Sequence, residues 1–477
     1  MRAEPLDVLK WPVLGPLLHW RHARMLFQVP ALLLSAVMIF DGLTGPAFAP
    51  KNLVTTLGWV HLRGLLVLVL LCAGNFFCFS CPLVLVRDFV RKFWTPRLNW
   101  PRKLRTKWIS IALFAGILFI YEAFSLWSSP WLTAWLVLLY FVAILIVDTL
   151  FKHATFCKFI CPIGQFNFVG STLSPLEVQV RDHGVCNGCS TRDCIRGTQS
   201  STPSLVTIQR GCELALFQPR KLGNLDCTFC LDCVHACPHD NVGIRARVPG
   251  EEWLADSLRS GLGRITKRRD LSALVVLFTF GALMNAFGMV SPIYRLETWL
   301  SGLLGLRNHT AIFAIVFAIV VLLEPVALLG AAAWLTLRWA GLRGALLQIA
   351  TRYSYALAPF GFGLWLAHYG FHFFTGLYTI VPLTQNAVRT FLGFAMLGEP
   401  RWTLVGLPAR MVQPVQFGFL ILGLFGSLFL VHQFAEEDAR DKWPRAFAPW
   451  AAVSLILFLA GAWLIVQPMD MRGTFLE

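Results

Sequence analysis

Residues 227–238 read C-T-F-C-L-D-C-V-H-A-C-P, with cysteines at Cys227, Cys230, Cys233 and Cys237. Three thiolates two residues apart can wrap around one iron–sulfur cube, whereas the cysteine before the proline is turned away and can ligate a second cube. The spacing C-x2-C-x2-C-x3-C-P therefore predicts iron–sulfur chemistry in this part of the chain.

Four further cysteines precede this run, at Cys186, Cys189, Cys194 and Cys212. The run is that of bacterial ferredoxins, whose crossover of ligands divides the eight cysteines into two sets. The first cysteine set is Cys186, Cys189, Cys194 and Cys237. The second cysteine set is Cys212, Cys227, Cys230 and Cys233. Each set is expected to hold one [4Fe-4S] cluster.

The first half of this segment departs from the regular pattern. Seventeen residues separate Cys194 from Cys212 where the regular motif has three, and no proline follows Cys212. A pair of zinc knuckles is the alternative, since C-x2-C pairs also suit tetrahedral zinc. The C-P ending and the lack of a histidine partner favour iron–sulfur clusters over zinc.

The composition is that of an integral membrane protein. Of the 477 residues 56% are hydrophobic and only 14% are charged, and the mean hydropathy is +0.62. The net charge of +15 could indicate a nucleic-acid partner, but the basic residues form short runs beside apolar stretches. They are therefore interpreted as topology signals and contacts with lipid head groups, with no nucleic-acid partner.

The apolar stretches predict about nine transmembrane helices, since each is long enough to cross the hydrocarbon core. They lie at about 25–43, 62–81, 108–127, 131–151, 271–290, 311–337, 353–381, 415–434 and 450–466. Basic runs before residue 25, at 87–107 and at 264–269 place the N-terminus and the cysteine segment in the cytoplasm of a bacterial cell, beneath its inner membrane. The expected fold is a polytopic α-helical membrane protein with an inserted, cytoplasmic, bacterial-ferredoxin-like domain. Its domains would be 1–152 (four transmembrane helices), 153–270 (two clusters) and 271–477 (about five transmembrane helices).

A short motif occurs twice near the ends of predicted spans. It reads F-C-F-S-C-P-L at residues 77–83 and F-C-K-F-I-C-P-I at residues 156–163. Cys78, Cys81, Cys157 and Cys161, the C-P group, are expected to converge at the cytoplasmic surface. A residue before proline resists the helical conformation, so a new helix should begin at each proline. Three interpretations remain open: a redox-active dithiol pair, ligands of a further metal centre, or buried packing residues.

Three histidines form another candidate site. His368 and His372 are four residues apart, so both project from one face of a helix, and His432 is the nearest candidate partner by expected depth in the membrane. Polar residues at such depth are costly and often functional. Haem b or copper binding, contact with a quinone, and packing among aromatic residues are the alternatives.

Residues 20–245 resemble the NosR/NapH-type membrane polyferredoxins, in which paired spans end in C-x3-C-P motifs and a cytoplasmic domain binds two [4Fe-4S] clusters. The resemblance rests on the C-P group and the two cysteine sets. It implies electron transfer between quinol or a cytoplasmic donor and a membrane-bound or periplasmic redox partner. Here the first motif has two intervening residues instead of three, and the last 200 residues lie outside the resemblance.

The sequence favours an oxidoreductase-type electron-transfer subunit of a respiratory system. Relatives in the resembling family include a copper-reducing assembly factor, so a metal-reducing assembly factor for a copper or haem enzyme is the alternative. A transporter regulated by the ferredoxin-like domain is a third interpretation. The electron donor, the acceptor and the direction of electron flow are not evident from these residues.

Overall fold

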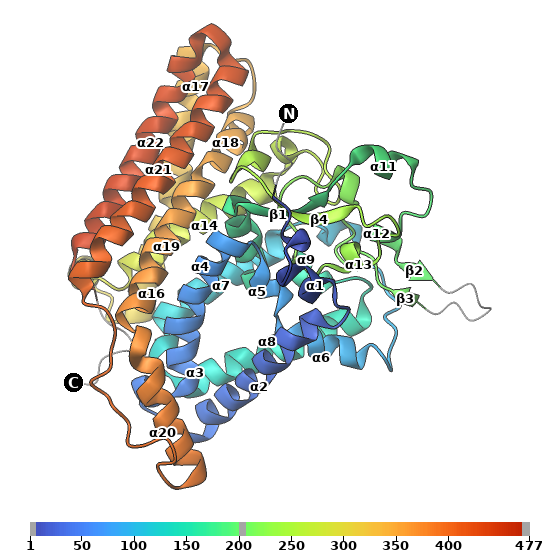
Figure 1. Ribbon diagram of the computed structural model, residues 1–477. Helices are drawn as coiled ribbons and strands as arrows, with labels where there is room; N and C mark the ends of the chain where they lie inside the picture. The colour runs from blue at the N-terminus through green and yellow to red at the C-terminus, as the bar shows by residue number, and fades with distance from the viewer. Residues whose placement is uncertain (1–5, 200–206, 470–477) are drawn as a thin grey trace. The chain divides into compact units, whose positions relative to one another are not determined.

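The computed structural model describes residues 6–199 and 207–469, which are mainly helical (Figure 1). The chain forms two compact units. Unit 1 comprises residues 1–34, 69–110 and 140–268, and unit 2 comprises residues 35–68, 111–139 and 269–477. The expected division into 1–152, 153–270 and 271–477 stays a prediction, although unit 2 resumes at Arg269, close to the last expected boundary.

Within the described residues, six helical segments are long and apolar enough to cross a membrane, as expected of a multi-pass membrane protein. They are Ala23–Thr44 (α2), Leu53–Ala73 (α3, Leu53–Thr56, and α4, Arg63–Ala73), Pro130–Leu150 (α8), Arg269–Phe287 (α14), His309–Ala340 (α16, His309–Ala318, and α17, Glu324–Ala340) and Ala409–Val466 (α21, Ala409–Ala439, and α22, Trp443–Val466). The nine spans expected from the sequence are therefore not confirmed.

Three expected spans differ in the structure. The second begins at Leu53, where Asn52 caps the helix, and ends at Ala73, before Gly74 with its φ of +67°. The third is a helix of 16 residues, α7 (Trp108–Ala123), shorter than the roughly 20 residues that a span needs. The seventh is divided into a 3-10 turn, α19 (Ala358–Thr375) and a second 3-10 turn.

The repeated motif forms the same local structure twice in unit 1. A short helix carries the first cysteine, and a second helix begins at the proline. The two pairs are α5 (Phe76–Phe79) with α6 (Pro82–Val90), and α9 (Thr155–Phe159) with α10 (Pro162–Gly170). Cys81 and Cys161 are extended N-cap residues, with ψ of 120° and 112°. The predicted helix starts at Pro82 and Pro162 are therefore confirmed.

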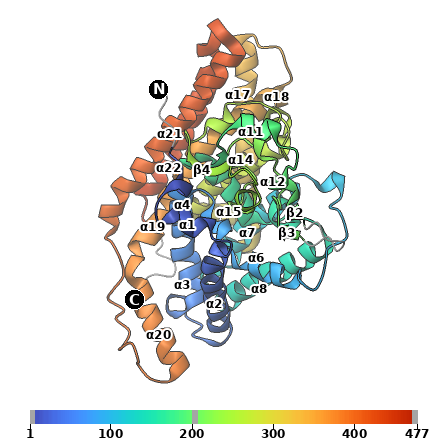
Figure 2. The ribbon, with the colours of Figure 1, turned by 45° about the vertical axis from the view of Figure 1, so that its right-hand side comes forward.

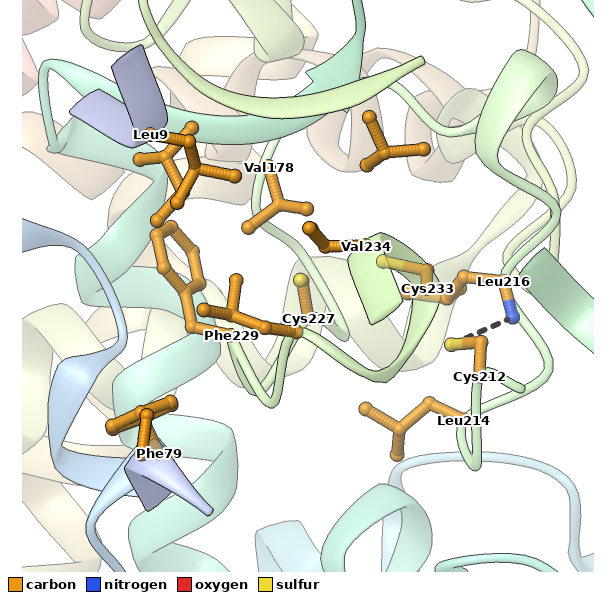
Figure 3. Packing of buried hydrophobic residues seen from close by; sticks show 14 of the residues in the cluster. Leu9, Phe79, Val178, Cys212, Leu214, Leu216, Cys227, Phe229, Cys233 and Val234 are labelled. Atoms are coloured by element: carbon orange, nitrogen blue, oxygen red, sulfur yellow. Dashed lines mark hydrogen bonds between the residues drawn. The ribbon is translucent and has the colours of Figure 1, made fainter. Parts of the chain in front are cut away.

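Two antiparallel strands enclose the cysteine-rich segment of unit 1. They are β1 (Leu176–Val180) and β4 (Val242–Ala246), in a register that pairs Val178 with Ile244. The other elements of this unit are α1 (Leu14–His19), α11 (His183–Gly188), α12 (Asp193–Arg196), β2 (Thr198–Gln199), β3 (Thr207–Gln209) and α13 (Asp232–His235). The apolar core includes Val178 and the second-set cysteines Cys212, Cys227 and Cys233 (Figure 3), and Cys194 and Cys237 of the first set pack against it.

Unit 2 is built around α14, α17, α19, α21 and α22, and Figures 1 and 2 both show α17, α21 and α22 side by side. Its other helices are α15 (Pro292–Leu304), α18 (Leu346–Ser354) and α20 (Ile380–Leu392). Helices α19 and α21 approach closely because glycines face one another. A Cβ atom on Gly363 would lie 2.5 Å from the Phe419 carbonyl oxygen, and one on Gly423 would lie 2.9 Å from that of Pro359. Small residues allow this spacing in membrane helix pairs.

Candidate redox site

The first cysteine set lines one pocket of unit 1. All four of its members border this pocket, together with residues such as Arg192, Phe217 and Gln218. Two N–H groups of Asn241 point at its sulfur atoms: Nδ2 donates to Cys186 Sγ and the backbone N to Cys237 Sγ, each at 3.3 Å. Hydrogen bonds to sulfur of this kind tune the potential of an iron–sulfur cluster.

The second cysteine set is more deeply buried. Cys212, Cys227 and Cys233 belong to the apolar core of unit 1. Figure 3 shows the sulfur atoms of Cys212 and Cys233 pointing toward the side on which Cys227 lies. Burial raises the pKa of the Cys212 thiol to about 11, and the neighbouring Cys227 adds to the shift. Burial also raises the pKa of Cys230, with further contributions from Cys212 and Cys233. The four thiols are therefore close enough to influence one another.

The insertion before Cys212 is accommodated by a hairpin. Strands β2 and β3 pair antiparallel, with residues 200–206 outside the described part of the chain. The Cys212 N–H then donates to the Cys194 carbonyl at 2.9 Å. The hairpin thus returns the chain to the point where it left, which places Cys212 beside a member of the first cysteine set.

The two cysteine loops have matching backbones. Helix α12 begins after Arg192 and carries Cys194, and helix α13 begins after Leu231 and carries Cys233. Both preceding residues are left-handed, with φ of 55° and 62°. This conformation costs a non-glycine residue about 1–2 kcal/mol, and such strain concentrates at functional sites. Both loops thus enter their helices through the same backbone conformation.

The donor chemistry of both sets fits an iron–sulfur cluster. Each set offers four soft thiolates, which are the ligands of [4Fe-4S] cubes. Among the described residues, no three His, Cys, Asp or Glu side chains form a group that could hold a single metal ion. A tetrahedral Zn²⁺ with 2.3 Å bonds needs sulfur atoms about 3.8 Å apart.

The C-P group brings its two repeats together. Cys81, Cys157 and Cys161 pack in one apolar cluster with Val84 and Phe156. Burial raises the pKa of Cys161, and the nearby Cys78 and Cys81 raise it further. Three of the four cysteines therefore lie in one cluster, whereas their position at the cytoplasmic surface stays a prediction.

The thiols of the C-P group have few features of an exchange-active dithiol. Burial raises the pKa of Cys78 to about 12, with a lowering contribution from the Asn167 hydrogen bond at 3.4 Å. Burial also places the pKa of Cys157 well above its usual value. A redox-active dithiol needs a lowered pKa, because the thiolate is the nucleophile. The raised pKa values therefore disfavour the dithiol interpretation, whereas the metal-centre and packing interpretations both stay open.

Buried ion pairs surround the cysteines, and sequence analysis did not identify them. Arg87, with 0% exposure, pairs with Asp148 at 3.3 Å and Glu213 at 2.5 Å. Lys107, 1% exposed, pairs with Asp226 at 2.5 Å. In the sequence, Glu213 follows Cys212 and Asp226 precedes Cys227. An acidic residue next to a cysteine was therefore the sequence signal that could have identified these ion pairs. Removing one partner of a buried pair is strongly destabilising.

The three candidate histidines do not form one site. His368 and His372 are buried on α19 with ring centroids 5.0 Å apart. Helix α21 runs past α19 with Gln416 Nε2 donating to the Ala367 carbonyl. His432 is 16 residues beyond Gln416, which is about 24 Å along a helix. His432 lies 3.6 Å from Glu436 instead. The grouping expected from the sequence is wrong, because the antiparallel helices place His432 at the opposite end.

Cys72 lies near the end of α4, and its side chain is exposed.

Comparison with known proteins gives one relevant similarity. A 97-residue stretch is 30% identical to the putative electron transport protein YccM of Escherichia coli (strain K12). The match covers 20% of this chain and only 23% of the length of that protein. No family model matches the chain. No solved structure matches it either.

Proposed function

We propose that this protein is a membrane-bound iron–sulfur electron-transfer protein of the NosR/NapH type. The observation that carries the proposal is the arrangement of its cysteines. Cys212, Cys227 and Cys233 lie in one apolar core, with Cys157, Cys194 and Cys237 packed against it. That core therefore contains members of both cysteine sets and of the C-P group. Such continuity suits a path for electrons, and the similarity to a putative electron transport protein agrees with this role.

The residues of this chain would hold and tune two [4Fe-4S] clusters, one on each cysteine set. When bound, such clusters accept and release single electrons, at potentials set by hydrogen bonds to sulfur, nearby charge and solvent exposure. Asn241 supplies hydrogen bonds at the first set. The Lys107–Asp226 pair places charges directly beside the second. The basic runs of the sequence support a cytoplasmic position for both sets, beneath the inner membrane of a bacterial cell.

The C-P group is proposed as the membrane-side end of this path, binding a soft metal. A second candidate function, reduction of a metal for assembly of a copper or haem enzyme, is favoured by the same four thiols. Thiolates select Cu(I) over harder ions. Copper bound to the purified protein, and lost in Cys161→Ser, would support this second function. His368 and His372 remain candidates for contact with a quinone or a haem.

Iron analysis of the full-length protein in detergent tests the main proposal. We expect about eight non-haem irons per chain, because two cubes of four follow from eight ligating thiolates. A brown absorbance that dithionite bleaches should accompany the iron. Stoichiometric zinc, or iron near four atoms per chain, would contradict the assignment of two clusters.

A further inference from the structure

Each C-P repeat begins with a residue that contacts a loop of the second cysteine set. Asn75 is the N-cap of α5, with φ of −83° and ψ of 45°, and Ala154 is the N-cap of α9, with φ of −88° and ψ of 63°. Both residues precede the motif phenylalanine by two positions, so they are equivalent in the repeat. They also share a backbone conformation.

The two N-cap residues donate hydrogen bonds to two different loops of the second cysteine set. Asn75 Nδ2 donates to the carbonyl of Cys227 at 2.9 Å. The Ala154 backbone N donates to the carbonyl of Glu213, beside Cys212, at 3.1 Å. The repeat thus contacts both loops that carry ligands of this set. Only at Asn75 does the contact depend on a side chain.

Asn75 also contacts the C-P group. Its side chain is 0% exposed, and Oδ1 accepts a hydrogen bond from the Cys78 backbone N at 3.4 Å. The preceding Gly74 has a φ of +67°, and a Cβ atom there would lie 2.5 Å from the Phe229 ring. The start of the motif therefore lies in direct contact with the Cys227–Cys230 loop. One amide bridges a cysteine of each group.

We propose that Asn75 is a positioning residue that couples the second cysteine set to the C-P group. The inference rests on the proposed function, because it concerns electron exchange between a cluster on that set and the C-P thiols. Its Nδ2–H group fixes the Cys227 loop and adds positive potential near the cluster ligands. Its Oδ1 atom holds the turn that presents Cys78. Loss of the bridge would separate the two groups without removing any cysteine.

Two substitutions distinguish the loss of this bridge from the loss of the helix cap. Asn75→Ser retains an N-cap hydroxyl, since serine caps about as well as asparagine, but its side chain is too short to reach Cys227. Asn75→Asp also caps, but it presents an acceptor and a negative charge where the donor was. Asn52→Ser is the matched control: Asn52 is equally buried, caps α3 through Oδ1 and donates through Nδ2 to the carbonyl of Asp41, and it belongs to unit 2, whereas both cysteine sets belong to unit 1.

The measurement is an EPR redox titration of the full-length protein in nanodiscs, together with its iron content. We expect all variants to retain the iron of the wild-type protein. Asn75→Ser should lower the midpoint potential of one cluster and Asn75→Asp should lower it further, because each removes positive potential that favours the reduced cluster. The other cluster should be unchanged, and Asn52→Ser should titrate like wild type.

A double-mutant cycle tests the coupling itself. Cys78→Ser should change the potential of the affected cluster when Asn75 is present and should leave it unchanged in the Asn75→Ser background. Unchanged potentials in both Asn75 variants, equal shifts in both clusters, or an undiminished Cys78→Ser effect would overturn the proposal. If Asn75→Ser loses iron, the cluster potentials of the isosteric Asn75→Asp variant are judged by the same criteria. Loss of iron in both variants would mean that Asn75 has a purely structural role, which would overturn the proposal. Absence of two clusters in the wild-type protein would instead contradict the proposed function.

Discussion

The two cysteine sets share a loop geometry but differ in their surroundings. Every member of the first set is partly exposed, whereas Cys212, Cys227 and Cys233 of the second are buried. The first set receives hydrogen bonds from a nearby amide, and the second is flanked by a buried ion pair and contacts the C-P repeats. A loop of this kind therefore occurs once at a partly exposed position and once at a buried one. The potential of a cluster depends on solvent exposure and nearby charge. Both quantities differ between the two sets because the neighbouring residues differ, although the ligands of both sets are cysteines.

The largest expected effect comes from removing one ligand of each set. Cys189→Ser and Cys233→Ser should each lower the iron content by about four atoms per chain, since each removes a ligand of one cube. Cys233→Ser should also lower the thermal denaturation midpoint, because this thiol is part of the apolar core. Cys72→Ser is the control and should retain all iron. Equal loss of both clusters in either variant would argue against the division into two sets.

The second cysteine set differs from the first because a buried ion pair, Lys107–Asp226, lies beside it. Lys107→Met leaves Asp226 buried without its partner, which should cost about 3–5 kcal/mol of stability. Arg264→Met is the matched control in the same unit, because Arg264 is 54% exposed and lies 3.8 Å from Asp256. A surface pair of this kind contributes about 0–1 kcal/mol. Thermal denaturation of both variants gives the comparison, and similar midpoints would show that the Lys107–Asp226 pair is not structurally important.

Substitutions in the C-P group test whether electrons pass from the second cysteine set through the C-P thiols. Cys81→Ser and Cys161→Ser should leave the iron of both sets intact but lower electron delivery to an acceptor by about tenfold or more, since serine is a poor ligand for soft metals. Cys72→Ser, whose side chain is exposed, should deliver electrons like wild type. Wild-type rates in both C-P variants would assign the motif to packing and make His368 and His372 the next candidates.

The sequence predicted local features better than distant contacts. The helix starts at Pro82 and Pro162 follow from the restricted backbone before proline, so they were predictable. The grouping of Cys212 with the second set stays a prediction, and the hairpin that returns Cys212 to Cys194 was not predictable from the sequence. His432 was misplaced because the register of two antiparallel helices depends on packing at Gly363 and Gly423. Asn75 was not identified because an asparagine near a helix start is ordinarily only a cap.

The smallest expected effect concerns the hydrogen bonds of the first set. Asn241→Ala removes the Nδ2 donor to Cys186 but retains the backbone donor to Cys237. A lost hydrogen bond of about 1 kcal/mol corresponds to roughly 40 mV for a one-electron couple, so the potential of the first cluster should fall by about this amount. Asn187→Ala is the matched control, because it makes the same change at an exposed position between Cys186 and Cys189. An EPR redox titration should show the second cluster unchanged in both variants. A shift of the second cluster would mean that the surroundings of the two sets are not independent. An equal shift of the first cluster in Asn187→Ala would mean that the Asn241 hydrogen bond does not set its potential.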